Sequence, residues 1–177
     1  MAPESPDRPV KRLLIQRAPK HDVLGLWAQW YAYRGWRVVP LHNPILLCHG
    51  ATCSCGDENC GSIGKHPRTT HGVHDASSDL RQVAKWWQLW PDANIGLACG
   101  ESFDVLDIDD SAAVSHFLDR FGGKAVIGLG PSSNPARGWH AYFQPLGRNG
   151  VRIGGEDVEW LSKGKLVVAP PSLHASG

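Results

Sequence analysis

Two aspartates near the middle of the chain are the first residues whose type and spacing could do chemistry. Asp107 and Asp109 are separated by one residue in the run FDVLDID. If this run is a strand, alternate side chains face the same way, so the two carboxylates share one face about 7 Å apart. Carboxylates held this close repel one another unless a cation lies between them, and Mg²⁺ and Mn²⁺ prefer oxygen ligands. The pair predicts a divalent-metal site, with a solvated acidic turn at the strand end as the alternative.

Two further runs each place a polar side chain on an expected strand. In GWHAYF, alternation puts His140 and Tyr142 on one face and the other apolar residues on the opposite face. His140 is then placed to meet a phosphate oxygen, with a purely structural histidine as the alternative. In VEWL, Glu159 faces away from its apolar neighbours and supplies a third carboxylate. Burying this carboxylate without a partner would be costly, which favours a paired or metal-bound role.

A cluster of cysteines and a histidine predicts a zinc site. In a reducing compartment such a cluster indicates metal ligands before disulfides, and three thiolates with one imidazole suit tetrahedral zinc. The expected ligands are Cys53, Cys55, Cys60 and His66. His42 or Cys48 could replace one of them, and other histidines lie nearby, namely His49, His71 and His74. With every position filled by protein, the ion would be structural.

The helices that position these residues follow from apolar periodicity and capping residues. We expect a helix that Asp22 caps and that ends at Gly35, and a second helix that starts near Ser77 or Ser78 and ends before Pro91. The inward residues of the second helix are expected to be Leu80, Val83, Ala84 and Trp87. A third helix is expected over residues 111–121.

Short apolar runs predict the strands. They cover residues 36–41, 94–99, 103–109, 125–129, 139–143, 158–161 and 166–169. The last two are expected to form a hairpin around residues 162–165. Residues 42–75 are expected to be a long irregular insertion that zinc orders. Cys99, away from the cluster, is expected to be a buried small apolar residue.

Composition limits the classes of protein that the chain can belong to. Its 177 residues carry a formal net charge of +1, which excludes a strongly basic nucleic-acid coat and leaves polyanion binding to local clusters or bound metals. Hydrophobic residues make up 42 %, enough for a core. No apolar run is long enough for a membrane span, and the first residues lack the apolar core of a signal peptide, so we expect a cytoplasmic protein without a membrane partner. Residues 1–20 are expected to be a flexible arm.

The order of these motifs resembles the bifunctional primase/polymerase (prim-pol) domains of the archaeo-eukaryotic primase superfamily, found in phage and plasmid replication proteins. The resemblance rests on the acidic strand, on Gly-x-His, on the later strand carboxylate and on VVAPPSLHASG near the end. It extends to GKHPR, WW and PDANIG and runs from about Trp27 to the last residue. Two positions depart from the family pattern: the third carboxylate, Glu159, is more usually Asp, with Asp157 as a stand-in, and Gly138 stands where Ser is frequent.

The resemblance implies a role for each site residue. Asp107, Asp109 and Glu159 would hold two catalytic Mg²⁺ or Mn²⁺ ions, and His140 would contact the incoming triphosphate. Further contacts to nucleotide or template phosphates are expected from Lys65, Arg68, Arg137 and Ser172. No covalent nucleophile is required for this two-metal phosphoryl transfer.

The implied fold is α+β, with an N-terminal α/β lobe over residues 21–100 that carries the zinc loop, packed on a catalytic lobe like an RNA-recognition motif over residues 101–177. The implied function is a DNA-dependent nucleotidyltransferase that makes or extends primers from NTPs or dNTPs on a single-stranded DNA template. We also expect the chain to be the N-terminal fragment of a longer protein with a helicase region or partner. The alternatives are a non-catalytic zinc module that binds DNA and a metal-dependent nuclease.

Overall fold

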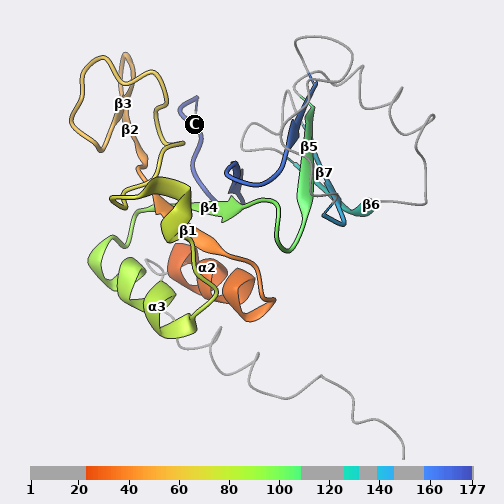
Figure 1. Ribbon diagram of the computed structural model, residues 1–177. Coiled ribbons are helices and arrows are strands. Elements are labelled where there is room, and N and C mark those ends of the chain that lie inside the picture. The colour runs from red at the N-terminus through yellow and green to blue at the C-terminus, as the bar shows by residue number, and fades with distance from the viewer. Residues whose placement is uncertain (1–22, 109–125, 132–138, 146–157, 177) are drawn as a thin grey trace, which may run out of the picture.

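The computed structural model describes residues 23–108, 126–131, 139–145 and 158–176 (Figure 1). The arm expected over residues 1–20 and the helix expected over 111–121 lie outside these ranges, and so do Asp109, Arg137 and Asp157. None of the described helices is long and apolar enough to cross a bilayer.

The first unit is a three-stranded antiparallel sheet covered by two helices. Its strand order is β1(Val38–Leu41)–β4(Asn94–Ala98)–β9(Leu166–Ala169), and α2(Val23–Tyr33) and α3(Leu80–Leu89) pack beside it (Figure 1). All five residues of β4 are buried, as expected for the central strand of a covered sheet. The core between sheet and helices contains Ala28, Val38, Val83, Trp87, Ile95, Leu97 and Val167.

Helix α3 begins later than the sequence predicted, and this changes which residues it buries. Asp79 is the N-cap, because its carboxylate accepts the Arg81 N–H at 2.8 Å, while the Ser77 hydroxyl accepts the Asp79 N–H at 3.0 Å. Leu80 is therefore the first helical residue and is 42 % exposed, so the prediction that it faces the core was wrong. Val83 and Trp87 are buried as predicted.

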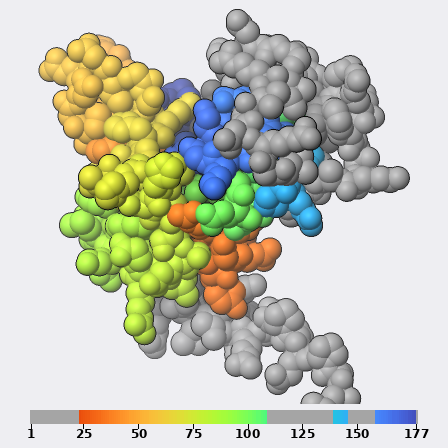
Figure 2. All heavy atoms as spheres, viewed as in Figure 1, coloured from red at the N-terminus to blue at the C-terminus, as the bar shows by residue number. Residues whose placement is uncertain are grey.

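Part of the segment predicted to be irregular is regular. Strands β2(Pro44–Leu47) and β3(Gly50–Cys53) pair antiparallel as a two-stranded ribbon, and η1(Gly72–Asp75) is a short 3₁₀ helix. The ribbon projects from the N-terminal unit (Figures 1 and 2). Its short strands could not be recognised from the sequence because most of β2 is exposed and so lacks an alternating pattern.

The second unit is a four-stranded antiparallel sheet with the order β6–β7–β5–β8 (Figure 1). The strands are β5(Asp104–Ile108), β6(Val126–Pro131), β7(Trp139–Phe143) and β8(Val158–Leu161). Strand β5 lies in the interior of the sheet, between β7 and β8. The segments that carry Asp107, His140 and Glu159 were predicted to be strands, and this prediction is confirmed.

The predicted hairpin between the last two strands was wrong. The turn exists, with the Lys165 N–H donating to the Ser162 carbonyl at 2.9 Å, but β8 pairs with β5 and β9 pairs with β4. The chain therefore crosses from one sheet to the other at this turn. It runs beside the β4–β5 connection, where the Cys99 N–H donates to the Lys165 carbonyl at 2.9 Å. Long-range pairing to two different sheets outweighs the local preference for a hairpin.

The turn between β8 and β9 and the β4–β5 connection approach each other so closely that they require a glycine. Gly100 has φ +98°, and a Cβ there would lie 2.5 Å from the backbone N and Cα of Lys163. We expect Gly100→Ala to lower the free energy of unfolding by about 2 kcal/mol or more, from strain at positive φ together with the clash. Urea unfolding measures this loss.

Gly164→Ala is the matched control for this effect. Gly164 has a similar φ of +83° but no atom within 4 Å of the added Cβ, so its variant carries the backbone strain without the clash. A loss in Gly100→Ala that does not exceed the loss in Gly164→Ala would contradict the close crossing.

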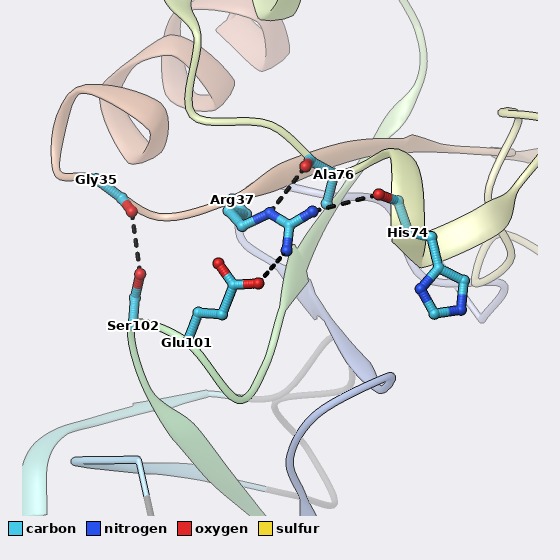
Figure 3. Close-up of polar contacts among 6 residues, drawn as sticks. All are labelled: Gly35, Arg37, His74, Ala76, Glu101 and Ser102. Carbon is cyan, nitrogen blue, oxygen red and sulfur yellow. Dashed lines mark hydrogen bonds and ion pairs between the residues drawn. The ribbon is translucent and has the colours of Figure 1, made fainter. Parts of the chain in front are cut away.

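Polar contacts also tie the β4–β5 connection to the first unit (Figure 3). Arg37 donates from Nε to the Ala76 carbonyl at 2.9 Å and from Nη2 to the His74 carbonyl at 3.2 Å, and its Nη1 pairs with Glu101. Ser102 donates to the Gly35 carbonyl at 3.0 Å. These contacts fix the segment that leads directly into β5.

Aromatic stacking joins the two sheets in one core. The ring of Trp36 stacks on Tyr31 from α2 and on Tyr142 from β7, with centroids 5.6 and 5.9 Å apart and planes within 13°. Phe103 packs edge-on against Trp36. The core of the first unit therefore continues onto one face of the four-stranded sheet.

Candidate functional site

Three of the predicted site residues form one row across the four-stranded sheet. In the antiparallel register, Asp107 of β5 lies opposite His140 of β7 on one side and Glu159 of β8 on the other. Residues directly opposite each other on antiparallel strands point to the same face. The Asp107 Oδ1 atom lies 3.3 Å from His140 Nε2. Three strands that are separate in the sequence thus bring these three side chains together.

The neighbouring row on the same face explains how this site is held. Val105, Tyr142 and Leu161 are also cross-strand partners, and they pack into the core shared with the first unit. Asp107 lies two residues further along β5, at the margin of that core. The site face is therefore the face that packs against the N-terminal unit.

Two buried atoms in the row lack a hydrogen bond among the described residues, although one of them, Asp107 Oδ1, lies in ion-pair range of His140 Nε2. Asp107 Oδ1 and His140 Nδ1 are buried and make no hydrogen bond within the described part of the chain. Buried polar atoms normally have hydrogen-bond partners, so such atoms need an explanation, and a functional role is one of them. Carboxylate oxygens are the donors that Mg²⁺ and Mn²⁺ prefer, and a histidine ring nitrogen can donate to a phosphate oxygen. The donor set fits a metal–phosphate ligand.

Glu159 lies in a more open environment than its sequence suggested. Its side chain is 41 % exposed, and its Oε1 lies 3.4 Å from Nζ of Lys165, which is 53 % exposed. The reason is topological, because β8 is an edge strand of the sheet. The argument that burial forces Glu159 into a paired role therefore does not apply, although a partner is present.

The four residues predicted to bind zinc converge at the base of the β2–β3 ribbon. One ligand atom from each of Cys53, Cys55, Cys60 and His66 lies within 4.8 Å of all the others. The Nε2 atom of His66 is 3.4 Å from the Cys53 sulfur and 3.5 Å from the Cys60 sulfur. Tetrahedral coordination with ordinary Zn–S and Zn–N bonds sets the S···N distance at about 3.6 Å. The cluster is therefore compatible with a structural zinc ion.

The electrostatics of the cluster favour a thiolate. Burial raises the pKa of the Cys53 thiol, but hydrogen bonds from the backbone of Gly64 and Cys55 and from the His66 ring outweigh burial and lower that pKa to about 6. Thiolates are the form that binds metals.

The competing zinc ligands lie outside the cluster. His42 contacts the Ser54 hydroxyl through Nδ1 at 3.1 Å and stacks on the His66 ring with centroids 4.5 Å apart. Burial, Arg68 and His66 together lower the pKa of His42. Cys48 is exposed in the turn between β2 and β3.

Arg68 is held in place by the protein itself. Its Nε donates to the Leu41 carbonyl at 3.1 Å, and its Nη2 donates to Asn43 Oδ1 and to the Ser54 hydroxyl at 2.7 and 2.8 Å. Its guanidinium also lies over the Trp90 ring, 5.8 Å from the centroid. Arg68 thus connects the zinc-loop segment to β1 and to the end of α3.

The other predicted phosphate-contacting residues have different surroundings. Lys65 is exposed and precedes His66 of the cysteine–histidine cluster. The Ser172 hydroxyl accepts the Ile95 N–H at 2.8 Å, so it connects the C-terminal segment to β4. Neither residue has a described contact with the Asp107 row.

Sequence reasoning missed two buried polar residues that support the site. Asn94 donates to the carbonyls of Gly64 and Leu173 at 2.9 and 2.8 Å and accepts the Leu173 N–H, joining the zinc loop to the C-terminal segment. Asp104 accepts from the Ser162 hydroxyl at 2.7 Å and from Trp160 Nε1 at 3.3 Å, which joins β5 to β8. A polar residue at the first position of a mostly apolar strand was the available signal in both cases.

Cys99 is buried, as the sequence predicted. Burial, with smaller contributions from the Asp104 and Asp107 carboxylates, raises the pKa of its thiol to about 12. The thiol is therefore protonated at neutral pH and behaves as a small apolar group.

Comparison with known proteins places the chain in a family. The family model described as bifunctional DNA primase/polymerase, N-terminal, matches residues 28–177, which is most of the chain. No curated protein matches the chain. The matched range contains both the Asp107 row and the cysteine–histidine cluster. The chain therefore belongs to the bifunctional DNA primase/polymerase family, whose activity lies in DNA replication and whose substrates are DNA and nucleotides.

Proposed function

We propose that the chain is a template-directed nucleotidyltransferase that makes primers or extends them from NTPs or dNTPs. The observation that carries this proposal is the row of Asp107, His140 and Glu159 on one sheet face, in which a buried atom of each of the first two makes no hydrogen bond within the described part of the chain. A purely structural acidic strand would not need three polar residues aligned across three strands.

The residues divide the chemistry between them. Asp107 and Glu159, with Asp109, hold Mg²⁺ or Mn²⁺, which when bound would activate the primer 3′-hydroxyl and offset charge on the phosphates. His140 donates to an oxygen of the incoming triphosphate. The 3′-hydroxyl loses its proton to water and its oxygen bonds to the α-phosphorus, as the bond from that phosphorus to the bridging oxygen of the β-phosphate breaks and pyrophosphate leaves. Lys65, Arg68, Arg137 and Ser172 are proposed to support nucleotide or template phosphates.

Two structural features support the proposed architecture. The order β6–β7–β5–β8, with every neighbouring pair antiparallel, is the strand order of an RNA-recognition-motif-like sheet, in which the first strand lies between the third and the fourth. The geometry of the cysteine–histidine cluster supports a structural zinc ion in the N-terminal unit.

The wider setting is proposed from the family. We expect a single-stranded DNA template as partner, a helicase region in the same or a partner chain, and a role in phage or plasmid replication in the cytoplasm. Preference for NTPs or dNTPs is part of the test below.

A primer-extension experiment separates this proposal from its alternatives. A 5′-labelled primer on a single-stranded template is incubated with Mn²⁺ and with either NTPs or dNTPs. The proposal predicts products longer than the primer with at least one nucleotide type. Shorter products would indicate a nuclease, and an unchanged primer that is nevertheless bound would indicate a non-catalytic module.

A further inference from the structure

An open pocket on the N-terminal unit lies outside the site described so far. It has a volume of about 750 Å³ and lies between α3 and the segment that leads into that helix. These two parts of the chain lie side by side on the face shown in Figure 2. The volume of the pocket falls within the range of small-ligand pockets, about 300–1,000 Å³. Trp86, Trp90, Gln82, Arg68 and His74 are among its lining residues.

The lining has the chemistry that recognises a nucleobase. Trp86 and Trp90 are only partly buried and present indole surface, on which any base can stack. The Gln82 amide offers both donors and an acceptor for the polar edge of a base. Arg68 supplies a fixed positive charge, because hydrogen bonds hold its guanidinium over Trp90.

Two basic side chains of α3 are next to pocket residues in the sequence. Arg81 and Lys85 are exposed on α3, one position before Gln82 and Trp86 in the sequence, and neither side chain has an ion-pair partner in the part of the chain described. Acidic groups are present as well: Asp75 lines the pocket and contacts His71 at 3.0 Å, Asp79 caps α3, and Asp92 interacts with Arg68. Basic side chains beside exposed aromatic rings are the pattern of single-strand binding.

The pocket is attached to the strand that carries the proposed catalytic aspartate. Arg37 makes the connection. It donates to the carbonyls of His74 and Ala76, two residues that line the pocket, and it pairs with Glu101, which precedes β5 (Figure 3). A nucleic-acid strand bound in the pocket is therefore connected through Arg37 to the segment that leads to Asp107.

We infer that this pocket binds a base of a single-stranded nucleic acid, with Trp86 and Trp90 as stacking surfaces and Arg68, Arg81 and Lys85 facing the phosphates. The inference rests on the proposed function in that it takes the template as the source of this strand. It assigns the pocket to template binding and leaves the chemistry to the Asp107 row.

The test measures binding without catalysis. The affinity of the full chain for a fluorescein-labelled 15-nucleotide oligothymidine is measured by anisotropy in a buffer without Mg²⁺, Mn²⁺ or nucleotide. Stacking on one aromatic ring contributes about 1–3 kcal/mol, so Trp90→Leu is expected to raise Kd about 5- to 150-fold. Trp27→Leu is the matched control, because Trp27 is 42 % exposed on α2 and lies outside the pocket lining.

Charge variants test the polar side of the inference without touching the core. Lys85→Gln should weaken binding and reduce its salt dependence. Arg34→Gln removes the same charge from the end of α2 and should do neither, although Arg34 also lies beside an indole ring. Equal effects of the two variants would overturn the inference.

Crosslinking still tests the inference if Trp90→Leu fails to fold. Crosslinking of the native chain to an oligonucleotide that contains 5-bromodeoxyuridine should give adducts within residues 68–90, and adducts confined to other segments would overturn the inference. A folded Trp90→Leu that binds within about twofold of Trp27→Leu would also overturn it. Primer extension on the same preparations separates the two proposals, because binding by the pocket does not require activity and activity does not require binding by the pocket.

Discussion

Asp107→Asn is expected to abolish nucleotide incorporation while leaving the protein folded. The substitution keeps the size of the side chain but removes the negative charge that attracts a divalent cation to the centre of the row. Transition-state stabilisation by a bound metal amounts to several kcal/mol, so the rate should fall at least about a hundredfold. Steady-state primer extension in Mn²⁺ measures this rate.

Glu58→Gln is the control for the loss of charge. Glu58 is exposed in the zinc loop, so this variant makes the same chemical change away from the row and should retain activity. An Asp107→Asn protein with native thermal stability and more than about a tenth of native activity would place the metal elsewhere.

Cys53→Ser is expected to release zinc and destabilise the N-terminal unit. Cys53 is buried and contributes one of the four clustered ligand atoms, so its loss leaves three ligands and a partly formed site. Structural zinc supplies folding free energy directly, so the melting temperature should fall by about 10 °C or more. Zinc content by atomic absorption and thermal unfolding by circular dichroism measure the two effects.

Cys48→Ser provides the matched control for the zinc prediction. Cys48 is exposed and lies outside the cluster, so the same substitution there should keep both the zinc and the melting temperature. Native zinc content in Cys53→Ser, or equal zinc loss in both variants, would contradict the ligand assignment.

The row of site residues could be foreseen only in part. Alternation along a strand is a local property, so the shared face of His140 and Tyr142 followed from the sequence. The alignment of Asp107 with His140 and Glu159 depends on the pairing of β5 with β7 and β8, which is long-range. The motif order suggested that these residues act together, whereas the register shows how the sheet aligns them.

The cysteine–histidine cluster was predictable because its four residues are close in sequence and their chemistry is specific. The pairing of the last two strands was not predictable. The same turn can connect two strands of one sheet or two strands that belong to different sheets, as it does here. The exposed position of Leu80 depended on which of several polar residues caps α3. The role of Arg68 required the structure, because its acceptors on Leu41, Asn43 and Ser54 come from a different segment.

The measurement that tests the central claim most directly is the ratio of pyrophosphate released to nucleotide incorporated on a single-stranded DNA template with Mn²⁺. The native chain and Asp107→Asn are compared side by side, with and without a primer. Nucleotidyl transfer at the Asp107 row predicts equal amounts of the two products from the native chain and the loss of both in the variant. Incorporation that survives in a folded Asp107→Asn, or no incorporation by a folded, zinc-loaded native chain even with a primer, would contradict the account.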